Sequence, residues 1–260
     1  MNRTSGILLP IFSLPSPYGI GTFGRAAYEF IDFLHDAGQT WWQILPLSVA
    51  GEGDSPYLSP SAYAGNPYFI DLNELIAQGL LTEAECDAAD LGSKTDDIDY
   101  GHLFVERFKL LRTAYGRRGD KPIDKVFSEK NKDWLPDYAL FMALKDAHGG
   151  KSFLEWEDDL RLRKADAIAA AREKYSAQIG FYEFLQEEFY REWGRLKAYA
   201  NDLGIRIIGD IPIYVAGDSA DVWSHPELFQ LDEDGLPVAV AGCPPDGFSA
   251  TGQLWGNPLY

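Results

Sequence analysis

The sequence has no long hydrophobic run. Its longest apolar stretch, residues 7–12, is interrupted by Pro10, whereas a membrane-spanning helix needs about 20 consecutive apolar residues. The first residues, Met1–Thr4, also lead into a segment with proline where a secretory signal peptide needs an uninterrupted apolar core. We therefore expect no membrane partner and a cytoplasmic protein.

Cysteine, histidine pairs and basic clusters are also scarce. Cys86 and Cys243 are far apart in the sequence, and none of the four histidines is paired at metal-ligand spacing. This excludes a disulfide framework and gives no reason to expect a metal or another cofactor. The net charge of −17 would repel phosphate backbones, and the only basic cluster, at Arg117 and Arg118, is short. We expect no nucleic-acid partner, and the sequence says nothing about oligomeric state.

Aromatic residues are abundant, at 14% of the chain with seven tryptophans. Core packing accounts for most of them. The alternative is a sugar-binding cleft, in which aromatic faces pack on the C–H faces of pyranose rings. Tryptophans on predicted strands and helices or in the segment between them are assigned to the core: Trp41, Trp42, Trp134, Trp156 and Trp193.

The opening of the chain reads as strand, helix, strand. Residues 5–14 and 40–47 are short apolar runs of strand length. Between them, apolar residues recur at i, i+3, i+4 and i+7 from Ala27 to Leu34, and Gly38 ends the predicted helix. This order favours a parallel crossover and an α/β fold.

A third strand is predicted only at residues 206–215, although a simple β-α-β unit takes about 30 residues. The long interval contains predicted helices at 135–148 and 161–176 and a clear amphipathic helix from Leu185 to Leu203, stopped by Gly204. A mostly helical segment is therefore inserted between strands two and three. Residues 218–260 read as loop. Three parallel strands cannot close a barrel, so the fold looks incomplete.

The loop after the first strand contains G-x-G-x-x-G at Gly19, Gly21 and Gly24, which suggests a nicotinamide or flavin oxidoreductase. A dinucleotide site needs an acidic residue at the end of the second strand, but that strand ends in Ile-Leu-Pro-Leu. The sequence therefore favours the alternative interpretation, in which the glycines allow the backbone to cross the end of the sheet in a tight loop.

Four stretches carry a resemblance: SLPSPYGIGTFG, DSPYLSPSAYAGNPYFIDL, GDIPIYVAGDSADVW and PPDGFSATGQLWGNPLY, at residues 13–24, 54–72, 209–223 and 244–260. Together and in this order they resemble the amylomaltases, the 4-α-glucanotransferases of the α-amylase-like glycosidase clan, over the amino-terminal half of such an enzyme. The resemblance implies about the first three strands of a (β/α)8 TIM barrel with the insertion between strands two and three. The implied segments are 1–72 (barrel), 73–178 (mostly helical insertion) and 179–260 (barrel with an active-site flap loop).

The resemblance also implies an activity. Such enzymes transfer α-1,4-glucan segments between maltooligosaccharides derived from starch or glycogen, by a retaining double displacement that needs two carboxyl groups about 5 Å apart. The family's nucleophile and acid/base correspond to positions after Tyr260, so no catalytic residue is assigned within the chain and the isolated 260 residues are expected to be inactive. The alternative is a glucan-binding protein without catalysis.

The resemblance assigns substrate-binding roles to Tyr57, Asp210, Phe248, Ser249, Trp255 and Asn257. Tyr57 is expected to stack on the donor glucose, and Asp210 to hydrogen-bond sugar hydroxyls and organise the nucleophile. From its sequence context alone, Asp210 is the best catalytic carboxylate, since an acid in an apolar strand needs a reason. Trp255, followed by Gly256 and Asn257, matches the acceptor side, and Phe248 and Ser249 lie in the flap. Asp218, Asp221 and Trp223 are expected to fix the loop after the third strand, with Ser219 or Asp218 as a helix cap.

Overall fold

The computed structural model describes residues 3–92 and 97–260. The chain divides into two compact units. The first contains Met1–Leu47, Gly65–Phe127 and Phe184–Asp210, and the second contains Ser48–Ala64, Ser128–Glu183 and Ile211–Tyr260. Each unit therefore collects segments that are distant in the sequence. The segments 1–72, 73–178 and 179–260 implied by the resemblance stay a prediction.

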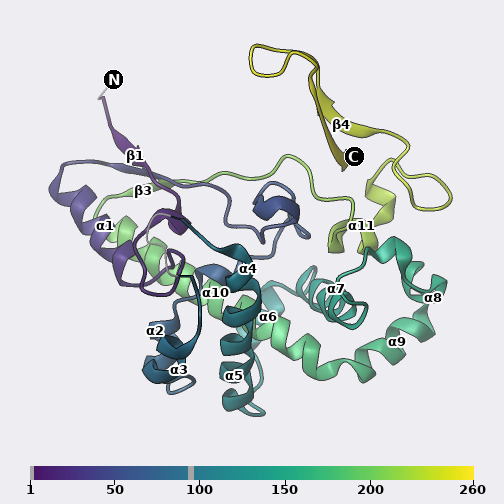
Figure 1. Ribbon diagram of the computed structural model, residues 1–260, viewed down its shortest axis with the longest axis horizontal. Helices are drawn as coiled ribbons and strands as arrows, with labels where there is room; N and C mark the ends of the chain where they lie inside the picture. The colour runs from purple at the N-terminus through teal and green to yellow at the C-terminus, as the bar shows by residue number, and fades with distance from the viewer. Residues whose placement is uncertain (1–2, 93–96) are drawn as a thin grey trace. The chain divides into compact units, whose positions relative to one another are not determined.

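A parallel sheet of three strands lies in the first unit (Figure 1). Strand β2 (Trp41–Gln43) is central and pairs in parallel with β1 (Gly6–Leu8) on one side and with β3 (Arg206–Ile208) on the other. Its middle residue, Trp42, is fully buried, and the indole Nε1 donates to the carbonyl of Leu9 at 2.8 Å. The predicted parallel order of three strands is confirmed.

The strands are shorter than the predicted runs 5–14, 40–47 and 206–215. A proline follows each of them within four residues, at Pro10, Pro46 and Pro212. Proline has no N–H to donate to a ladder and fixes its own φ, so pairing stops before it. After Pro10 the chain turns into the 3-10 helix η1 (Ile11–Ser13).

Helix α1 (Arg25–Asp36) connects β1 to β2 and presents an apolar stripe to the sheet. Ala27, Ile31 and Leu34 are fully buried on that stripe, as the spacing predicts. The helix ends where expected, because Gly38 has φ +68°, a left-handed conformation that glycine adopts without steric cost.

The segment between β2 and β3 is helical, as predicted. Its helices are α2 (Leu72–Ala77), α3 (Glu83–Ala88), α4 (Tyr100–His102), α5 (Phe108–Arg118), α6 (Lys125–Lys130), α7 (Leu135–Ala147), α8 (Asp158–Arg161), α9 (Ala165–Lys174) and α10 (Ser176–Asp202). The prediction of a single helix at 161–176 is wrong. Arg163 has φ +53°, a left-handed conformation that interrupts the helix and separates α8 from α9. Helix α10 ends before Gly204, whose φ is +77°.

The core of the second unit is rich in aromatic rings. Phe141 of α7 contacts Trp156 and Trp223 with ring centroids 5.5 and 5.7 Å apart. Trp42 and Trp156 confirm their assignment to the core, and Trp134 packs against this second core from a partly buried position. Trp41 and Trp193 are also partly buried.

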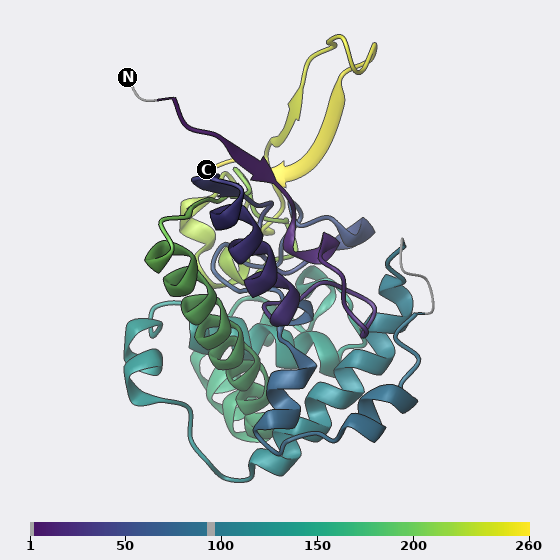
Figure 2. The ribbon, with the colours of Figure 1, turned by 90° about the vertical axis from the view of Figure 1, so that its left-hand side faces the viewer.

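The last part of the chain is more regular than the predicted loop. It contains α11 (Ala220–Ser224) and an antiparallel hairpin of β4 (Val240–Cys243) and β5 (Gln253–Pro258). Figure 2 draws this hairpin in yellow, at the carboxyl-terminal end of the colour range. The two strands approach closely at Gly242, where a Cβ would lie 2.5 Å from the carbonyl oxygen of Gln253. Glycine is therefore required at that crossing.

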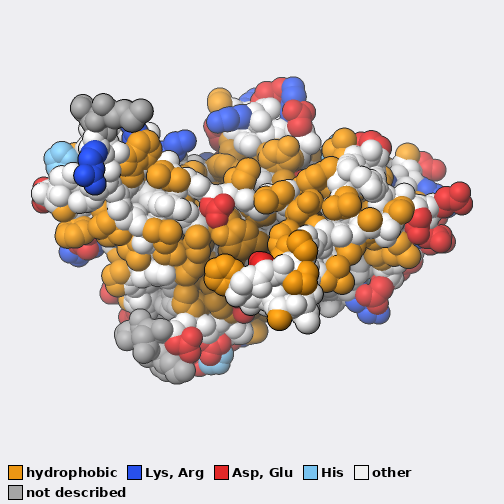
Figure 3. Space-filling view, turned by 90° about the horizontal axis from the view of Figure 1, so that it is seen from above, with side chains coloured by type: hydrophobic (Ala, Val, Ile, Leu, Met, Phe, Trp, Pro, Cys, Tyr) orange, Lys and Arg blue, Asp and Glu red, His pale blue; other side chains and the backbone are white. Residues whose placement is uncertain are grey.

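Large apolar side chains reach the surface in several places, as Figure 3 shows for one face. In the second unit, Ile211, Ile213 and Phe248 are 80%, 74% and 98% exposed. Ile211 and Ile213 lie in the segment after β3, and Phe248 lies at the tip of the hairpin. Among the described residues, no helix combines the length and apolar character needed to span a membrane.

Candidate functional site

The glycines of the loop after β1 serve contacts within the chain. Gly19 has φ +80°, and a Cβ there would lie 2.0 Å from the carbonyl oxygen of Leu91. A Cβ on Gly21 would lie 2.0 Å from the carbonyl oxygen of Ile11. Both glycines are needed because another part of the backbone occupies the space of a side chain. This supports the tight-loop interpretation.

The start of α1 does not suit a phosphate group. Gly24 is its N-cap, and a Cβ there would lie 1.9 Å from Oδ2 of Asp71, so a carboxylate already occupies this position. An acidic group stabilises the positive end of a helix, but it repels the pyrophosphate that a dinucleotide would place there.

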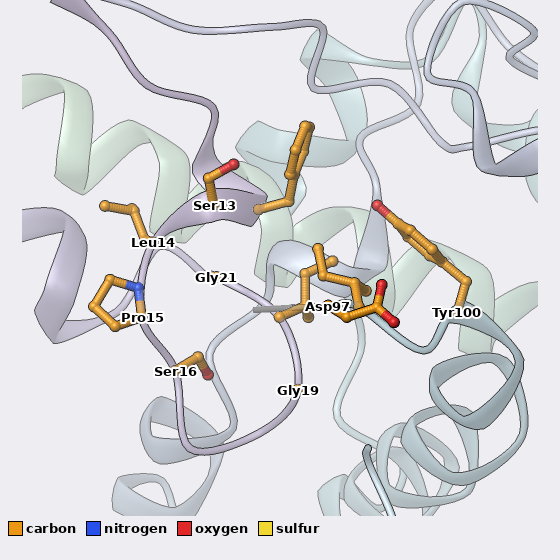
Figure 4. A pocket seen from close by; sticks show the side chains of 11 residues that line it. Ser13, Leu14, Pro15, Ser16, Gly19, Gly21, Asp97 and Tyr100 are labelled. Atoms are coloured by element: carbon orange, nitrogen blue, oxygen red, sulfur yellow. The ribbon is translucent and has the colours of Figure 1, made fainter. Parts of the chain in front are cut away.

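A cavity of about 600 Å³ adjoins this loop. Figure 4 shows Ser13–Ser16, Gly19 and Gly21 on the loop and Tyr100 across from them. Its only charged lining residue in the described chain is Asp97. Among residues 3–92 and 97–260 no lysine or arginine lines the cavity to bind a phosphate, and together with the carboxylate at Gly24 this disfavours a dinucleotide site.

A buried arginine holds the Gly-rich loop in place. Arg107 is fully buried and donates through its guanidinium to the carbonyl oxygens of Tyr18 at 3.3 Å and Ile70 at 2.5 Å. Burial lowers the pKa of Arg107 to about 10, while the nearby carboxylates of Asp71 and Glu192 oppose this shift. The loop is therefore fixed from the inside by a side chain that cannot reach a ligand.

The loop Ser48–Ala64 presents Tyr57 with 44% of its surface exposed. A short turn shapes this region: the N–H of Tyr57 donates to Oγ of Ser55 at 3.2 Å, and Oγ of Ser48 donates to the carbonyl of Pro56 at 2.8 Å. The aromatic ring is thus accessible on a backbone that is held at both ends of the turn. This geometry fits a stacking surface.

Three hydrogen bonds tie this loop to the segment that follows β3. The N–H of Ala216 donates to the carbonyl of Ser59 at 3.1 Å, and the N–H of Ala220 donates to the carbonyl of Pro60 at 2.8 Å. Oδ2 of Asp221 accepts the N–H of Ala62 at 2.9 Å. Asp221 therefore has a structural role, but it bonds the Ser48–Ala64 loop and not, as expected, the loop after the third strand.

The neighbouring residues have structural roles too. Ser219 is the N-cap of α11, since its Oγ accepts the N–H of Val222 at 3.2 Å. Asp218 instead accepts hydrogen bonds from Nζ of Lys145 at 2.5 Å and from the N–H of Phe153 at 3.0 Å. Of the two predicted caps, Ser219 is the one used.

Strand β5 carries Trp255 and Asn257. Trp255 is 43% exposed, and its ring centroid lies 6.4 Å from that of Tyr214. Asn257 is only 4% exposed, and its Nδ2 donates to the carbonyl of Val215 at 2.8 Å. The amide therefore joins the hairpin to the segment after β3, which leaves Trp255 as the accessible member of the pair.

The tip of the hairpin presents Phe248 with 98% of its surface exposed. Oδ1 of Asp246 accepts the N–H groups of Phe248 and Ser249, both at 2.8 Å, and Oγ of Ser249 donates to the carbonyl of Gly252 at 2.6 Å. The tip is a locally closed turn that carries one bare aromatic ring.

Asp210 differs from the expectation. It lies two residues beyond the end of β3 and is exposed, so it is not an acid within an apolar strand. The early end of the strand is the reason, because the chain has left the sheet before this position. Asp210 is the last residue of the first unit, whereas the other five predicted residues belong to the second.

Within the second unit, the segment Tyr214–Ala216 joins the Tyr57 loop to the hairpin through the hydrogen bonds of Ala216 and Val215. Sequence reasoning missed Tyr214 and Tyr260, whose rings stack at 5.7 Å and 15°. An alternating pattern in IYVAGD would have drawn attention to Tyr214. Within residues 3–92 and 97–260, no group of three or more His, Cys, Asp or Glu side chains is placed to hold a metal ion.

Comparison with known proteins gives a consistent result. The profile of glycosyl hydrolase family 77, described as 4-alpha-glucanotransferase, matches residues 9–260. The chain is 51% identical to the 4-alpha-glucanotransferase of Clostridium butyricum, over 96% of this chain and 52% of that protein. It is 49% identical to that of Thermus thermophilus, over 99% and 52%.

A solved structure shows the same fold. The amylomaltase of Streptococcus agalactiae, in complex with acarbose, superposes with a TM-score of 0.93 at 45% identity, over 100% of this chain and 53% of that chain. This confirms an α/β fold matching amylomaltase. The chain spans about half the length of the relatives it matches.

Proposed function

The chain belongs to the 4-alpha-glucanotransferase family, glycosyl hydrolase family 77, and from this premise we propose that it forms the glucan-binding part of an enzyme that transfers α-1,4-glucan segments between maltooligosaccharides. The observation that carries the proposal is the match of residues 9–260 together with a superposition at a TM-score of 0.93. That the superposed amylomaltase is described in complex with acarbose supports a carbohydrate ligand.

We propose that β1, β2 and β3 are the first three strands of a (β/α)8 barrel, with the helical insertion between the second and third. Consecutive strands that pair in parallel, with a helix covering the first crossover, support this assignment. Ligands bind beyond the carboxyl ends of such strands, where the Gly-rich loop and Asp210 follow β1 and β3. We also propose the three segments 1–72, 73–178 and 179–260 and a cytoplasmic location.

The proposed roles follow from what each side chain offers. Tyr57 and Trp255 give exposed aromatic faces for the apolar faces of glucose units. Asp210 accepts hydrogen bonds from sugar hydroxyls, since an ionised carboxylate is an acceptor only. Phe248 and Ser249 cover bound glucan from the hairpin tip, and Asn257 supports Trp255 through its bond to Val215.

In the proposed reaction, one carboxylate attacks the anomeric carbon while a carboxylic acid protonates the departing 4-oxygen, which gives a covalent glycosyl-enzyme. The 4-hydroxyl of a second glucan then attacks that carbon as the same group takes its proton. Neither carboxyl group is assigned to a residue of this chain. What the chain contributes is binding, orientation and exclusion of water, which favours transfer over hydrolysis.

Incubation of the purified 260-residue protein with maltotriose tests the proposal. We expect saturable binding by calorimetry with no new products, because the carboxylates that break the bond are assigned elsewhere. Tyr57→Ala is expected to weaken binding at least tenfold, and Tyr57→Phe, which keeps the aromatic face, is the matched control. Equal binding by all three proteins contradicts the role of Tyr57.

The second candidate function is glucan binding without catalysis. The same exposed aromatic residues favour it. It differs from the first candidate in that the whole protein binds glucan without transferring it. Both candidates predict binding without products for these 260 residues. The whole protein distinguishes them, since a ladder of longer maltooligosaccharides plus glucose indicates transfer, whereas maltotriose that stays unchanged indicates binding alone.

A further inference from the structure

A cavity of about 660 Å³ lies within the second unit, in the usual size range for small-molecule sites. Three parts of the unit form its walls: the loop at Tyr63, the turn before α7 at Trp134, and α11 with the residues after it. None of the six predicted site residues lines it. It is a second concave surface in the same unit.

The wall at Tyr63 and Trp134 is aromatic. The two rings are nearly parallel, at 19°, with centroids 5.9 Å apart, which is the offset arrangement that leaves part of each face uncovered. Tyr63 is 58% exposed. The indole Nε1 of Trp134 donates to Oδ1 of Asn131 at 3.0 Å, so the ring is held in one orientation. The pair forms a fixed apolar step at the edge of the cavity.

Asp221 and His225 bring polar groups to the cavity, beside the apolar Leu228 and Phe229. Asp221 is partly buried, and burial raises the pKa of its carboxyl above that of an ordinary aspartate. Its Oδ2 accepts the N–H of Ala62, and its own backbone N–H also bonds to the carboxyl. The carboxyl oxygens still have lone pairs that can accept a ligand hydroxyl. His225 is exposed, with Nδ1 3.2 Å from Oε1 of Glu227.

A ligand of this cavity needs an apolar face and a hydroxyl donor. We infer that the cavity binds one glucose unit of an α-glucan, with a sugar face on Tyr63 and Trp134 and a hydroxyl donating to Asp221. The choice of an α-glucan, as opposed to another neutral sugar, rests on the proposed function. Stacking covers the C–H face of the pyranose, and the hydroxyl donates to a carboxyl oxygen that can accept more than one hydrogen bond.

Charged ligands fit less well. Asp133 and Asp221 line the cavity with Lys130, so an anion meets two carboxylates and a cation meets an ammonium group. A neutral polyhydroxylated ligand avoids both costs.

The experiment is a calorimetric titration of the complete 260-residue protein with maltotriose, and with tetramethylammonium chloride as the competing probe. The variants are Tyr63→Ala, its matched control Tyr63→Phe, Asp221→Asn and Tyr57→Ala. Asp221→Asn keeps an oxygen that accepts the N–H of Ala62, so the loop contact is preserved. Circular dichroism and the thermal midpoint establish that each variant is folded.

We expect two maltotriose sites, of which one is weakened in Tyr57→Ala. The second is unaffected by Tyr57→Ala, weakens at least tenfold in Tyr63→Ala, weakens in Asp221→Asn and is retained in Tyr63→Phe. A site of this kind supports the inference even if Tyr57 proves to have no role. Maltotriose binding that depends on Tyr57 but is unchanged in folded Tyr63→Ala overturns the inference and leaves the proposed function standing. Binding of tetramethylammonium without maltotriose, or no binding at all, overturns it as well.

Discussion

The side-chain amide of Asn257 donates to the backbone carbonyl of Val215 at 2.8 Å, and this bond joins the hairpin to the segment that follows β3. Asn257 is nearly inaccessible, so the role that the structure gives its amide is to hold the hairpin and not to contact a bound sugar. Asn257 is two residues after Trp255 on the same strand. Val215 is followed by Ala216, whose N–H bonds the Tyr57 loop. This buried contact therefore links the hairpin that carries Trp255 to the segment that also bonds the Tyr57 loop.

Asn257→Ala is expected to destabilise the protein by about 1–3 kcal/mol, because it leaves the Val215 carbonyl buried without a donor. The urea midpoint followed by circular dichroism measures the change. The control is Gln253→Ala, at an exposed position whose side chain accepts only from Trp255, with an expected change within about 0.5 kcal/mol. Weaker maltotriose binding with an unchanged midpoint would show that Asn257 acts on the ligand directly.

Glu192 is expected to make stability fall as pH rises. Its Oε2 accepts the N–H of Asp71 at 2.8 Å, its Oε1 is buried without a partner among the described residues, and burial raises its pKa well above the ordinary value. The folded state therefore holds a proton that the unfolded state has already lost. Between the ordinary pKa and the raised one, this group lowers the free energy of unfolding by about 1.4 kcal/mol per pH unit.

Glu192→Gln keeps an oxygen acceptor and does not titrate. Urea titrations from pH 5 to 8 should show a shallower loss of stability in this variant than in the parent protein. Glu29→Gln, on the exposed face of α1, is the matched control and should follow the parent. Identical pH dependence of the parent and Glu192→Gln would refute the assignment of a buried protonated carboxyl.

The two cysteines should react at very different rates. Cys86 is 1% exposed, and burial raises the pKa of its thiol to about 11, so only about a thousandth is thiolate at pH 8. Cys243 on β4 is partly exposed. A disulfide reagent such as Ellman's should label one thiol per native chain quickly and both thiols in guanidinium. Fast labelling that persists in Cys243→Ser would mean that Cys86 is accessible.

Gly21→Ala is expected to cost about 2–4 kcal/mol, since a Cβ there lies 2.0 Å from a backbone oxygen that cannot move aside cheaply. Gly116→Ala is the matched control. Gly116 lies within α5 with open space around a Cβ, so alanine should stabilise the protein by up to about 1 kcal/mol. Thermal midpoints compare the two. An unchanged thermal midpoint in Gly21→Ala would contradict the explanation that a close backbone oxygen requires glycine at this position.

Local rules predict several elements of this fold well. Glycines with left-handed backbone end α1 and α10 where the apolar pattern stops, at Gly38 and Gly204. The parallel order of the strands follows from the strand, helix, strand opening. Arg163 shows the limit of such reasoning, because its left-handed conformation splits a good helical pattern and no residue preference announces it.

The hairpin was missed although a signal was present. Asp246-Gly247 lies between two apolar runs, which is typical of a turn between strands, but the prolines around it favoured a loop. The site residues rest on the resemblance of whole segments and stay a prediction. Burial of Asn257 and exposure of Asp210 depend on which backbone each side chain meets in the folded chain, and no local pattern contains that information.

The turn at Asp246 fixes how the ring of Phe248 meets a ligand. Because three backbone groups of the tip are already hydrogen-bonded, the tip backbone has lost most of its conformational entropy during folding. Association then needs to immobilise little more than one side chain. In the proposed glucan-binding role, the ring of Phe248 therefore lies on a turn that is formed before a ligand arrives, and binding requires little rearrangement of the local backbone.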